Sequence, residues 1–189
     1  MKQQREFQPV AREGVTAWPA GDEPTAWVPG DFILTHNTRL LSKLIRFGQR
    51  LRIHGDDRVF AHWSHSALVI SEAGDLIDVD RRGVFRTHIR EYRDIEYKVV
   101  HTGASADDRR QAVDFAEWAA EQHHRIGALL FASIALNLLT GGKVSFFVDG
   151  TTVCSGLIAR AQERCGAIFH RSPTHIMPAD LAKYYDVRP

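Results

Sequence analysis

The segment 66–80 reads as a β-hairpin, and no other part of the sequence constrains the fold as strongly. Its first arm is Ser-Ala-Leu-Val-Ile, and the turn residues Ser-Glu-Ala-Gly separate it from a second arm, Asp-Leu-Ile-Asp-Val-Asp. This pattern predicts two antiparallel strands. Strand side chains alternate between the two faces of a sheet, and both loop lengths that the turn allows keep the same alternation. His65 therefore shares one face with Asp78 and Asp80.

The segments around the hairpin predict an α+β fold, in which a small, mostly antiparallel sheet packs against helices. Further strands are expected at 32–34, 84–85 and 97–100, and helices at 40–51, 105–122, 126–139, 154–164 and 179–184. Ser105 begins an S-x-x-D capping pattern, and Thr38 or Asn37 can cap the first helix. Residues 1–27 are rich in turn residues and are read as an N-terminal arm, and residues 28–189 as a single domain.

Charge and hydropathy exclude several classes of protein. The 189 residues carry 24 Lys and Arg against 23 Asp and Glu, so the net charge favours neither nucleic acid nor an anionic membrane as the main partner. The apolar stretch 126–139 is shorter than the roughly 20 residues of a membrane span, and we expect a buried helix there; a membrane-surface role is less favoured. The first residues lack an apolar signal sequence, and two cysteines cannot form a disulfide framework. We therefore expect a cytoplasmic protein with free thiols.

Cys154 is the candidate nucleophile because it stands at the predicted start of a helix. The N-terminus of a helix carries a positive partial charge and unpaired N–H groups, which lower the pKa of a thiol and can bind an oxyanion. The competing interpretation is a small buried hydrophobic residue, which is what most free cysteines are. Cys165, at the far end of the same helix, is expected to be such a residue.

A thiolate nucleophile needs a base and a group that orients the base. His65 enters the first strand of the hairpin, where its imidazole is held rigidly, and an aspartate on the same face can fix its tautomer. A single strand histidine is more often a polar edge residue, so it is the three-part arrangement that favours catalysis. Strand alternation does not choose between Asp78 and Asp80, and both stay candidates on this ground.

Neither a metal nor a cofactor is predicted. Two histidine pairs could be metal ligands, namely His62 with His65 and His123 with His124. Neither pair has a third ligand at a known spacing. The chain contains no C-x-x-C motif, and its glycines match neither nucleotide-binding fingerprint.

Four segments resemble a known family. These are Pro29–Thr35 with the helix that follows it, Trp63–Ile70 around His65, Val153–Ile158 around Cys154, and the closing Pro178–Ala182. They are similar to motifs of the circularly permuted, NlpC-like papain-fold proteins, the YiiX-like group related to lecithin retinol acyltransferase. The histidine precedes the cysteine, which is the order of the permuted group. The resemblance runs from about residue 28 to 186 and implies a papain-like fold.

The resemblance implies a cysteine hydrolase or acyltransferase that acts on an amide or ester bond of a small acyl, peptide or lipid-linked substrate, without a cofactor. Cys154 and His65 match the family's catalytic residues. The third polar residue of the family follows an apolar pair on the second hairpin strand, which favours Asp78 over Asp80, although many members have His or Glu there. A non-catalytic module that binds an acyl group or a peptide on the same fold is the alternative, and a membrane-surface protein is a third possibility.

Overall fold

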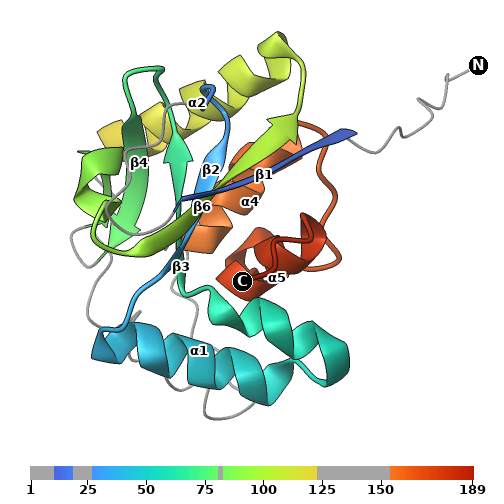
Figure 1. The fold of residues 1–189 in the computed structure, drawn as a ribbon. Coiled ribbons are helices and arrows are strands. Elements are labelled where there is room, and N and C mark those ends of the chain that lie inside the picture. Colours follow the sequence, from blue (N-terminus) through green and yellow to red (C-terminus); the bar gives the residue numbers. More distant parts are fainter. Residues whose placement is uncertain (1–10, 19–26, 81–82, 123–153) are drawn as a thin grey trace, which may run out of the picture.

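The computed structural model describes residues 11–18, 27–80, 83–122 and 154–189. Within these ranges six strands form one antiparallel sheet in the order β1-β6-β2-β3-β4-β5 (Figure 1). The strands are β1 (Ala11–Trp18), β2 (Phe32–His36), β3 (His65–Val69), β4 (Asp75–Asp80), β5 (Gly83–His88) and β6 (Glu96–Gly103). The expected helix at 126–139 lies outside the described residues.

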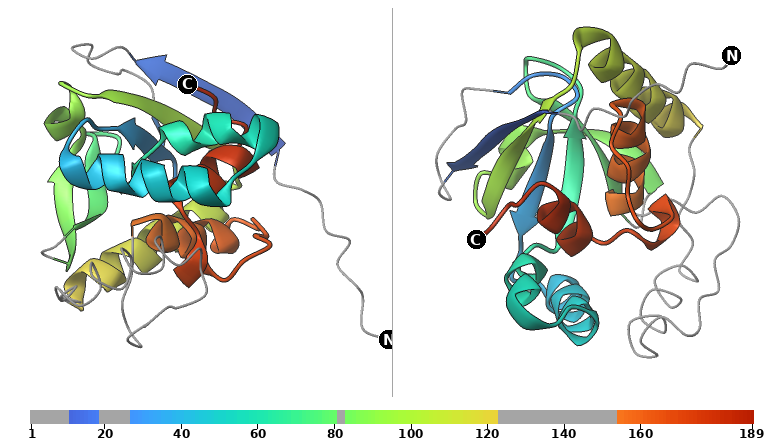
Figure 2. Two further views of the ribbon diagram at one scale, coloured as in Figure 1. Left: turned by 90° about the horizontal axis from the view of Figure 1, so that it is seen from below. Right: turned by 90° about the vertical axis from the view of Figure 1, so that its right-hand side faces the viewer.

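Helices cover one face and one end of this sheet, so the expected α+β class is confirmed. The α-helices are α1 (Leu40–Arg52), α2 (Ala106–Glu121), α4 (Cys154–Arg164) and α5 (Pro178–Tyr184), and the 3-10 helices are η1 (Gly55–His62), η2 (Ile89–Tyr92) and η3 (Pro173–His175). Figure 2 shows α2 and α4 side by side on one face, and α1 with η1 across the end at which β3 begins. In the described part of the chain, no helix has the length and hydropathy needed to cross a membrane.

The segment that the sequence assigned to an arm contributes a strand to the sheet. Residues 11–18 form β1, which pairs with β6 at the edge of the sheet. The register of this pair shifts between Arg12 and Gly14, as it does at a β-bulge. A glycine at a bulge breaks the alternation that marks a strand, and the sequence pattern therefore indicated a turn.

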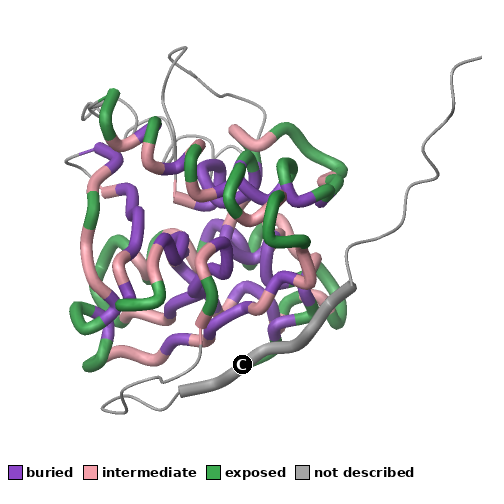
Figure 3. The backbone as a smooth tube through the Cα atoms, turned by 90° about the horizontal axis from the view of Figure 1, so that it is seen from above, coloured by how far each residue is buried: buried purple, intermediate pink, exposed green. Residues whose placement is uncertain are grey.

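Strand alternation divides the buried residues into two clusters. The larger cluster packs between the sheet and the helices and includes Phe32, Leu34, Leu68, Ile77, Leu157, Ile158 and Leu181. The smaller cluster lies on the opposite face and includes Ile33, Val69, Leu76, Tyr97 and Val99. Consecutive β2 residues thus point to opposite sides, and both sides are buried. Buried residues gather in the middle of the molecule and exposed ones at its rim (Figure 3).

The two expected helix caps have different outcomes. The Ser105 hydroxyl accepts a hydrogen bond from the Asp108 backbone N–H at 3.2 Å, so the cap of α2 is confirmed. The N-cap of α1 is Arg39, which makes no side-chain capping bond, so the expected cap at Thr38 or Asn37 is wrong. Asn37 instead accepts a bond from the Arg39 N–H at 2.9 Å and shapes the turn before the helix.

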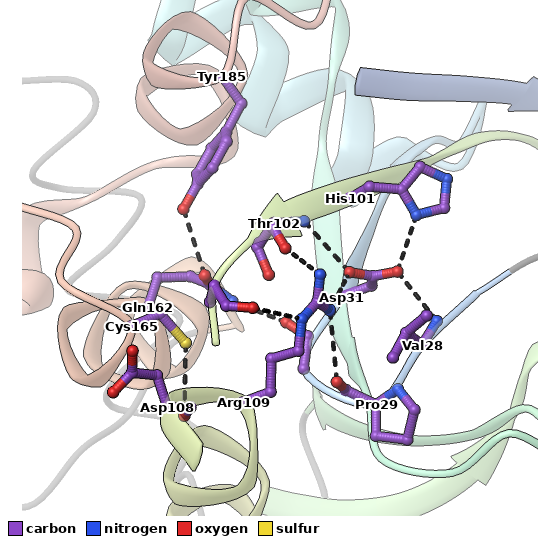
Figure 4. Close-up of polar contacts among 12 residues, drawn as sticks. Val28, Pro29, Asp31, His101, Thr102, Asp108, Arg109, Gln162, Cys165 and Tyr185 are labelled. Atoms are coloured by element: carbon purple, nitrogen blue, oxygen red, sulfur yellow. Dashed lines mark hydrogen bonds and ion pairs between the residues drawn. The ribbon is translucent and has the colours of Figure 1, made fainter. Parts of the chain in front are cut away.

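A fully buried aspartate fixes the start of β2 (Figure 4). Asp31 accepts hydrogen bonds from Arg109 Nη1 at 2.6 Å and from the Val28 and Thr102 backbone N–H groups, and it pairs with His101 Nδ1 at 2.8 Å. Arg109 comes from α2, and its side chain is only 12% exposed. The ion pair therefore ties the helix layer to two neighbouring strands.

We expect Asp31→Asn to lower the free energy of unfolding by about 3–5 kcal/mol, since it leaves a buried guanidinium without its counter-charge. Chemical denaturation followed by circular dichroism measures the change. Asp186→Asn is the matched control, because Asp186 and its partner Arg188 are both exposed, and it should cost at most about 1 kcal/mol. Equal losses in the two variants would show that burial adds nothing to the Asp31 pair.

Candidate active site

His65 and Asp78 meet where the hairpin strands separate. β3 and β4 pair through Leu68 with Ile77 and through Val69 with Leu76, which is one of the two registers compatible with the sequence. In this register Asp78 is diagonal to His65 on the same face, close enough for side chains to touch. His65 Nε2 lies 2.6 Å from Asp78 Oδ1. The strand pair thus holds the imidazole and the carboxylate in contact.

Cys154 reaches the same point from the helix layer. It is the first residue of α4, and it is partly exposed. Its thiol lies beside the His65 imidazole and the Ser66 backbone, and both act on the charge of the sulfur. Nε2 of His65 faces Asp78, so Nδ1 is the ring nitrogen that remains for another partner.

Buried contacts of α4 fix the position of the cysteine. The residue after it, Ser155, is buried and donates a hydrogen bond from Oγ to the Ile176 carbonyl at 2.6 Å. Leu157 and Ile158 on the next turn belong to the larger core cluster. The first turn of α4 is therefore anchored on the sheet, and the sulfur sits where the helix dipole is positive.

The charge of His65 stabilises the charged forms of both Cys154 and Asp78, while Asp78 acts in the opposite direction on Cys154. Burial disfavours the charged form of His65, but Asp78 and Cys154 outweigh it and hold the pKa of His65 well above its ordinary value. Burial likewise raises the pKa of the Cys154 thiol, but the His65 charge and hydrogen bonds from His65 and Ser66 bring that pKa below its ordinary value. Both directions favour a thiolate beside an imidazolium.

Asp78 is held in its charged form. Burial would raise the pKa of Asp78, but the charge of His65 and hydrogen bonds from His65, Tyr92 and Val79 lower it. The Tyr92 hydroxyl donates to Oδ2, and the Val79 backbone N–H donates to Oδ1. The carboxylate thus stays ionised and keeps a fixed orientation.

The sequence reasoning missed Tyr92. This buried residue ends η2, and its ring stacks on that of His65 at 6.4 Å between centroids. Burial and the Asp78 charge raise the pKa of Tyr92, so its hydroxyl keeps its proton and remains a donor. The contact joins residues 14 positions apart through an irregular segment. No periodic pattern marks such a residue in advance.

The other two candidate residues have different surroundings. Asp80 pairs in register with Gly83 at the end of β4 and its charge acts on Tyr92, whereas the carboxylate in contact with His65 is that of Asp78. Cys165 is buried near the end of α4, and burial and the nearby Asp108 raise its pKa to about 11. Its thiol therefore stays protonated at neutral pH.

Of the two histidine pairs noted in the sequence, only His62 with His65 lies in the described part of the chain, and these two do not share a cluster of ligands. His62 lies with His36 and Glu96 rather than with His65. His123 and His124 lie outside the described residues. Among the described residues, the Cys154 site contains one sulfur, one imidazole and one carboxylate. These three groups already contact one another.

No protein-family model matches the chain, and neither the curated proteins nor the solved structures contain a match. The chemistry of the site is therefore inferred from the geometry of Cys154, His65 and Asp78.

Proposed function

We propose that the protein is a cysteine hydrolase or acyltransferase on a permuted papain-like fold, and that it acts on an amide or ester bond of an acyl, peptide or lipid-linked substrate. The observation that carries this proposal is the contact between a helix-terminal thiol of lowered pKa and an imidazole of raised pKa paired with a buried carboxylate. Nucleophilic cysteine catalysis needs these three parts.

Each residue has one role in the proposed reaction. The Cys154 thiolate attacks the carbonyl carbon, and the backbone N–H groups at the start of α4 stabilise the oxyanion that forms. His65 gives its proton to the leaving nitrogen or oxygen, and an acyl thioester remains on Cys154. His65 then takes a proton from water or from an acceptor hydroxyl or amine, which attacks the thioester and releases the thiolate. Asp78 orients the imidazole throughout.

A panel of chromogenic acyl esters and acyl amides tests the proposal, with intact-protein mass spectrometry to detect the acyl thioester. The wild-type protein should gain the mass of the acyl group and release the leaving group, whereas Cys154→Ala should do neither. Water-soluble amines added as acceptors distinguish transfer from hydrolysis. Transfer gives the acylated amine, and hydrolysis gives the free acid. A protein that binds the acyl compounds without turning them over or being acylated is a binding module, and the proposal of catalysis would then be wrong.

We expect iodoacetamide to alkylate Cys154 much faster than Cys165 at pH 7. With its pKa at about 11, Cys165 is thiolate in only about one molecule in 10,000 at that pH. The pKa of Cys154 is lowered, so its thiolate persists as the pH falls and is lost only below that lowered pKa. Peptide mapping after timed alkylation between pH 5 and 9 measures both rates.

The same labelling on unfolded protein is the control, because the two thiols should then react at similar rates. Equal rates in the folded protein, or a Cys154 rate that rises only near pH 8.5 as for a free thiol, would contradict the ion pair.

A further inference from the structure

Two histidines and a glutamate converge at the end of the sheet, outside the Cys154 site. His36 ends β2, Glu96 begins β6, and these two residues face each other in the register of the strand pair. His62 ends η1 and reaches the same point. One ligand atom from each of the three lies within 4.8 Å of the other two.

The spacing of these atoms is close to that of a tetrahedral metal site. His62 Nε2 lies 3.0 Å from both Glu96 oxygens. Two ligands at metal bond lengths of 2.0–2.1 Å in a tetrahedron are about 3.3 Å apart. A few tenths of an ångström of opening between His62 and Glu96 therefore produces their coordination distance, and His36 lies within 4.8 Å of both and would move in to complete the set.

His36 is already prepared as a ligand. Its Nδ1 lies 2.9 Å from the His62 carbonyl oxygen, which only accepts, so Nδ1 carries the proton and Nε2 presents its lone pair. Ligating histidines commonly donate their second N–H in this way, which fixes the ring. The rings of His36 and His62 stack at 3.9 Å between centroids, so both imidazoles are held on one side of Glu96.

A carboxylate is among the three ligands, and it would offset part of the charge of a bound cation. The guanidinium of Arg46, which lies near His62, donates a hydrogen bond to the Asn37 carbonyl.

We propose that His36, His62 and Glu96 bind a divalent transition-metal ion, with Zn²⁺ as the best match to the donor set. Two imidazoles and one carboxylate with an open fourth position are a donor set typical of zinc. The ion would join β2, η1 and β6 close to the point from which the chain enters β3.

Titration of the chelator-treated protein with Co²⁺ tests this site, because tetrahedral Co²⁺ gives visible d–d bands. We expect one ion per chain. Zn²⁺ should displace the cobalt spectrum. Glu96→Gln, which keeps the size of the side chain, and His36→Ala should each weaken binding by at least about 100-fold, since even outer-shell changes cost 10- to 100-fold. His170→Ala removes an exposed histidine elsewhere and should change nothing.

Three results would overturn the proposal. One is the absence of any saturable spectrum in the wild-type protein. Another is a thiolate-to-cobalt charge-transfer band that disappears in Cys154→Ser, which would place the ion at the cysteine. The third is equal weakening by His170→Ala and Glu96→Gln, which would mean adventitious binding to surface histidines.

A separate observation concerns α1, whose apolar residues point away from the protein. The exposed apolar residues of α1 are Leu40, Leu41, Leu44, Phe47 and Leu51, which are between 44% and 74% exposed. Most of them recur every three or four residues and form one stripe along the helix. The buried side of α1 consists instead of Gly48 and Gln49. Gln49 donates a hydrogen bond to the Trp63 carbonyl and accepts one from the Ala179 N–H.

The charges that α1 itself carries are all positive. The basic residues in and next to α1 are Arg39, Lys43, Arg46, Arg50 and Arg52, and the helix contains no acidic residue. Arg52 pairs with Asp180, whereas Lys43 and Arg50 are exposed beside the stripe. A second copy of the same face would bring like charges together. An apolar stripe flanked by cations instead complements an anionic lipid surface.

We infer that α1 docks the protein on anionic membranes, with its apolar stripe among the acyl chains and its cations at the lipid headgroups. The sequence had suggested a membrane role only for residues 126–139, which lie outside the described part of the chain. Flotation with vesicles of phosphatidylglycerol and phosphatidylcholine tests α1. The protein should float with them, should not float with phosphatidylcholine alone, and should be released by high salt.

Leu44→Glu combined with Phe47→Glu should abolish flotation, because it puts carboxylates into the stripe. The matched control is Trp118→Glu, which changes an exposed apolar residue of α2 and should leave flotation intact. Failure of the wild-type protein to float, or equal effects of the two variants, would refute docking through α1. A wild-type dimer that dissociates in the double variant would assign the stripe to a second copy instead.

Discussion

Cys154→Ser is expected to lower the turnover of an acyl substrate by several orders of magnitude and to leave the fold intact. A serine hydroxyl nearly matches the thiol in size, so the core around α4 is undisturbed. Its proton is held far more tightly, and the stable ion pair with His65 is lost. Removing a nucleophile from a catalytic triad costs roughly 10⁴- to 10⁶-fold in kcat. Steady-state kinetics on the best ester of the panel measures the loss, and circular dichroism checks the fold.

Cys165→Ser is the matched control, because it makes the same substitution near the other end of the same helix. Cys165 is buried, and its thiol contacts the Asp108 carbonyl rather than an imidazole. This variant should keep nearly the wild-type rate. A similar loss in both variants would point to damage of α4, and an unchanged rate in Cys154→Ser would remove the cysteine from the mechanism.

The hairpin shows how much of the site could be predicted from local pattern. Strand alternation placed His65 and Asp78 on one face, because a side chain's face depends only on whether its position is odd or even. The start of α4 at Cys154 was equally readable, since the turn residues before it and the helical period after it are local signals. The meeting of strand and helix at one point was implied by the family resemblance and by no local pattern.

Contacts made over long sequence distances explain what was missed. Tyr92 reaches Asp78 through η2, and Glu96 reaches His36 through strand pairing between segments 60 residues apart (96 − 36). In the sequence, His62 and its close neighbour His65 form a possible ligand pair without a third ligand, and in the structure the two rings belong to different clusters. The register between strands that are far apart along the chain decides such contacts, and one sequence contains no signal for it.

The amphipathic pattern of α1 was read correctly as a helix, yet periodicity does not state which side is buried. A buried side normally carries the large apolar residues, whereas in α1 the buried positions are Gly48 and Gln49. Gln49 is buried because its amide satisfies two backbone groups of neighbouring segments. Gly48, which lies beside it, has no side chain, so the buried side of α1 presents no large apolar residue there. The apolar stripe is thereby left on the outside.

Asp78→Asn is expected to reduce turnover by about 10²- to 10⁴-fold, as the loss of the orienting carboxylate does in other triads. An amide keeps the size of the side chain, but it neither balances the imidazolium charge nor fixes the tautomer. Asp78 raises the pKa of His65, so its removal lowers that pKa. In a plot of turnover rate against pH, the rate falls on the alkaline side where the imidazolium loses its proton. This alkaline limb should therefore move to lower pH. A purely structural role would lower the rate without moving this limb.

Asp80→Asn is the matched control, because Asp80 lies two residues further along β4, on the same face by alternation. The contact of His65 Nε2 with Asp78 Oδ1 at 2.6 Å leads us to expect nearly wild-type turnover and an unmoved alkaline limb in Asp80→Asn. Tyr92→Phe, which removes one donor to Asp78, should give a smaller loss than Asp78→Asn. A larger loss in Asp80→Asn than in Asp78→Asn would reverse the assignment. Normal rates in both would exclude a carboxylate from the orientation of His65.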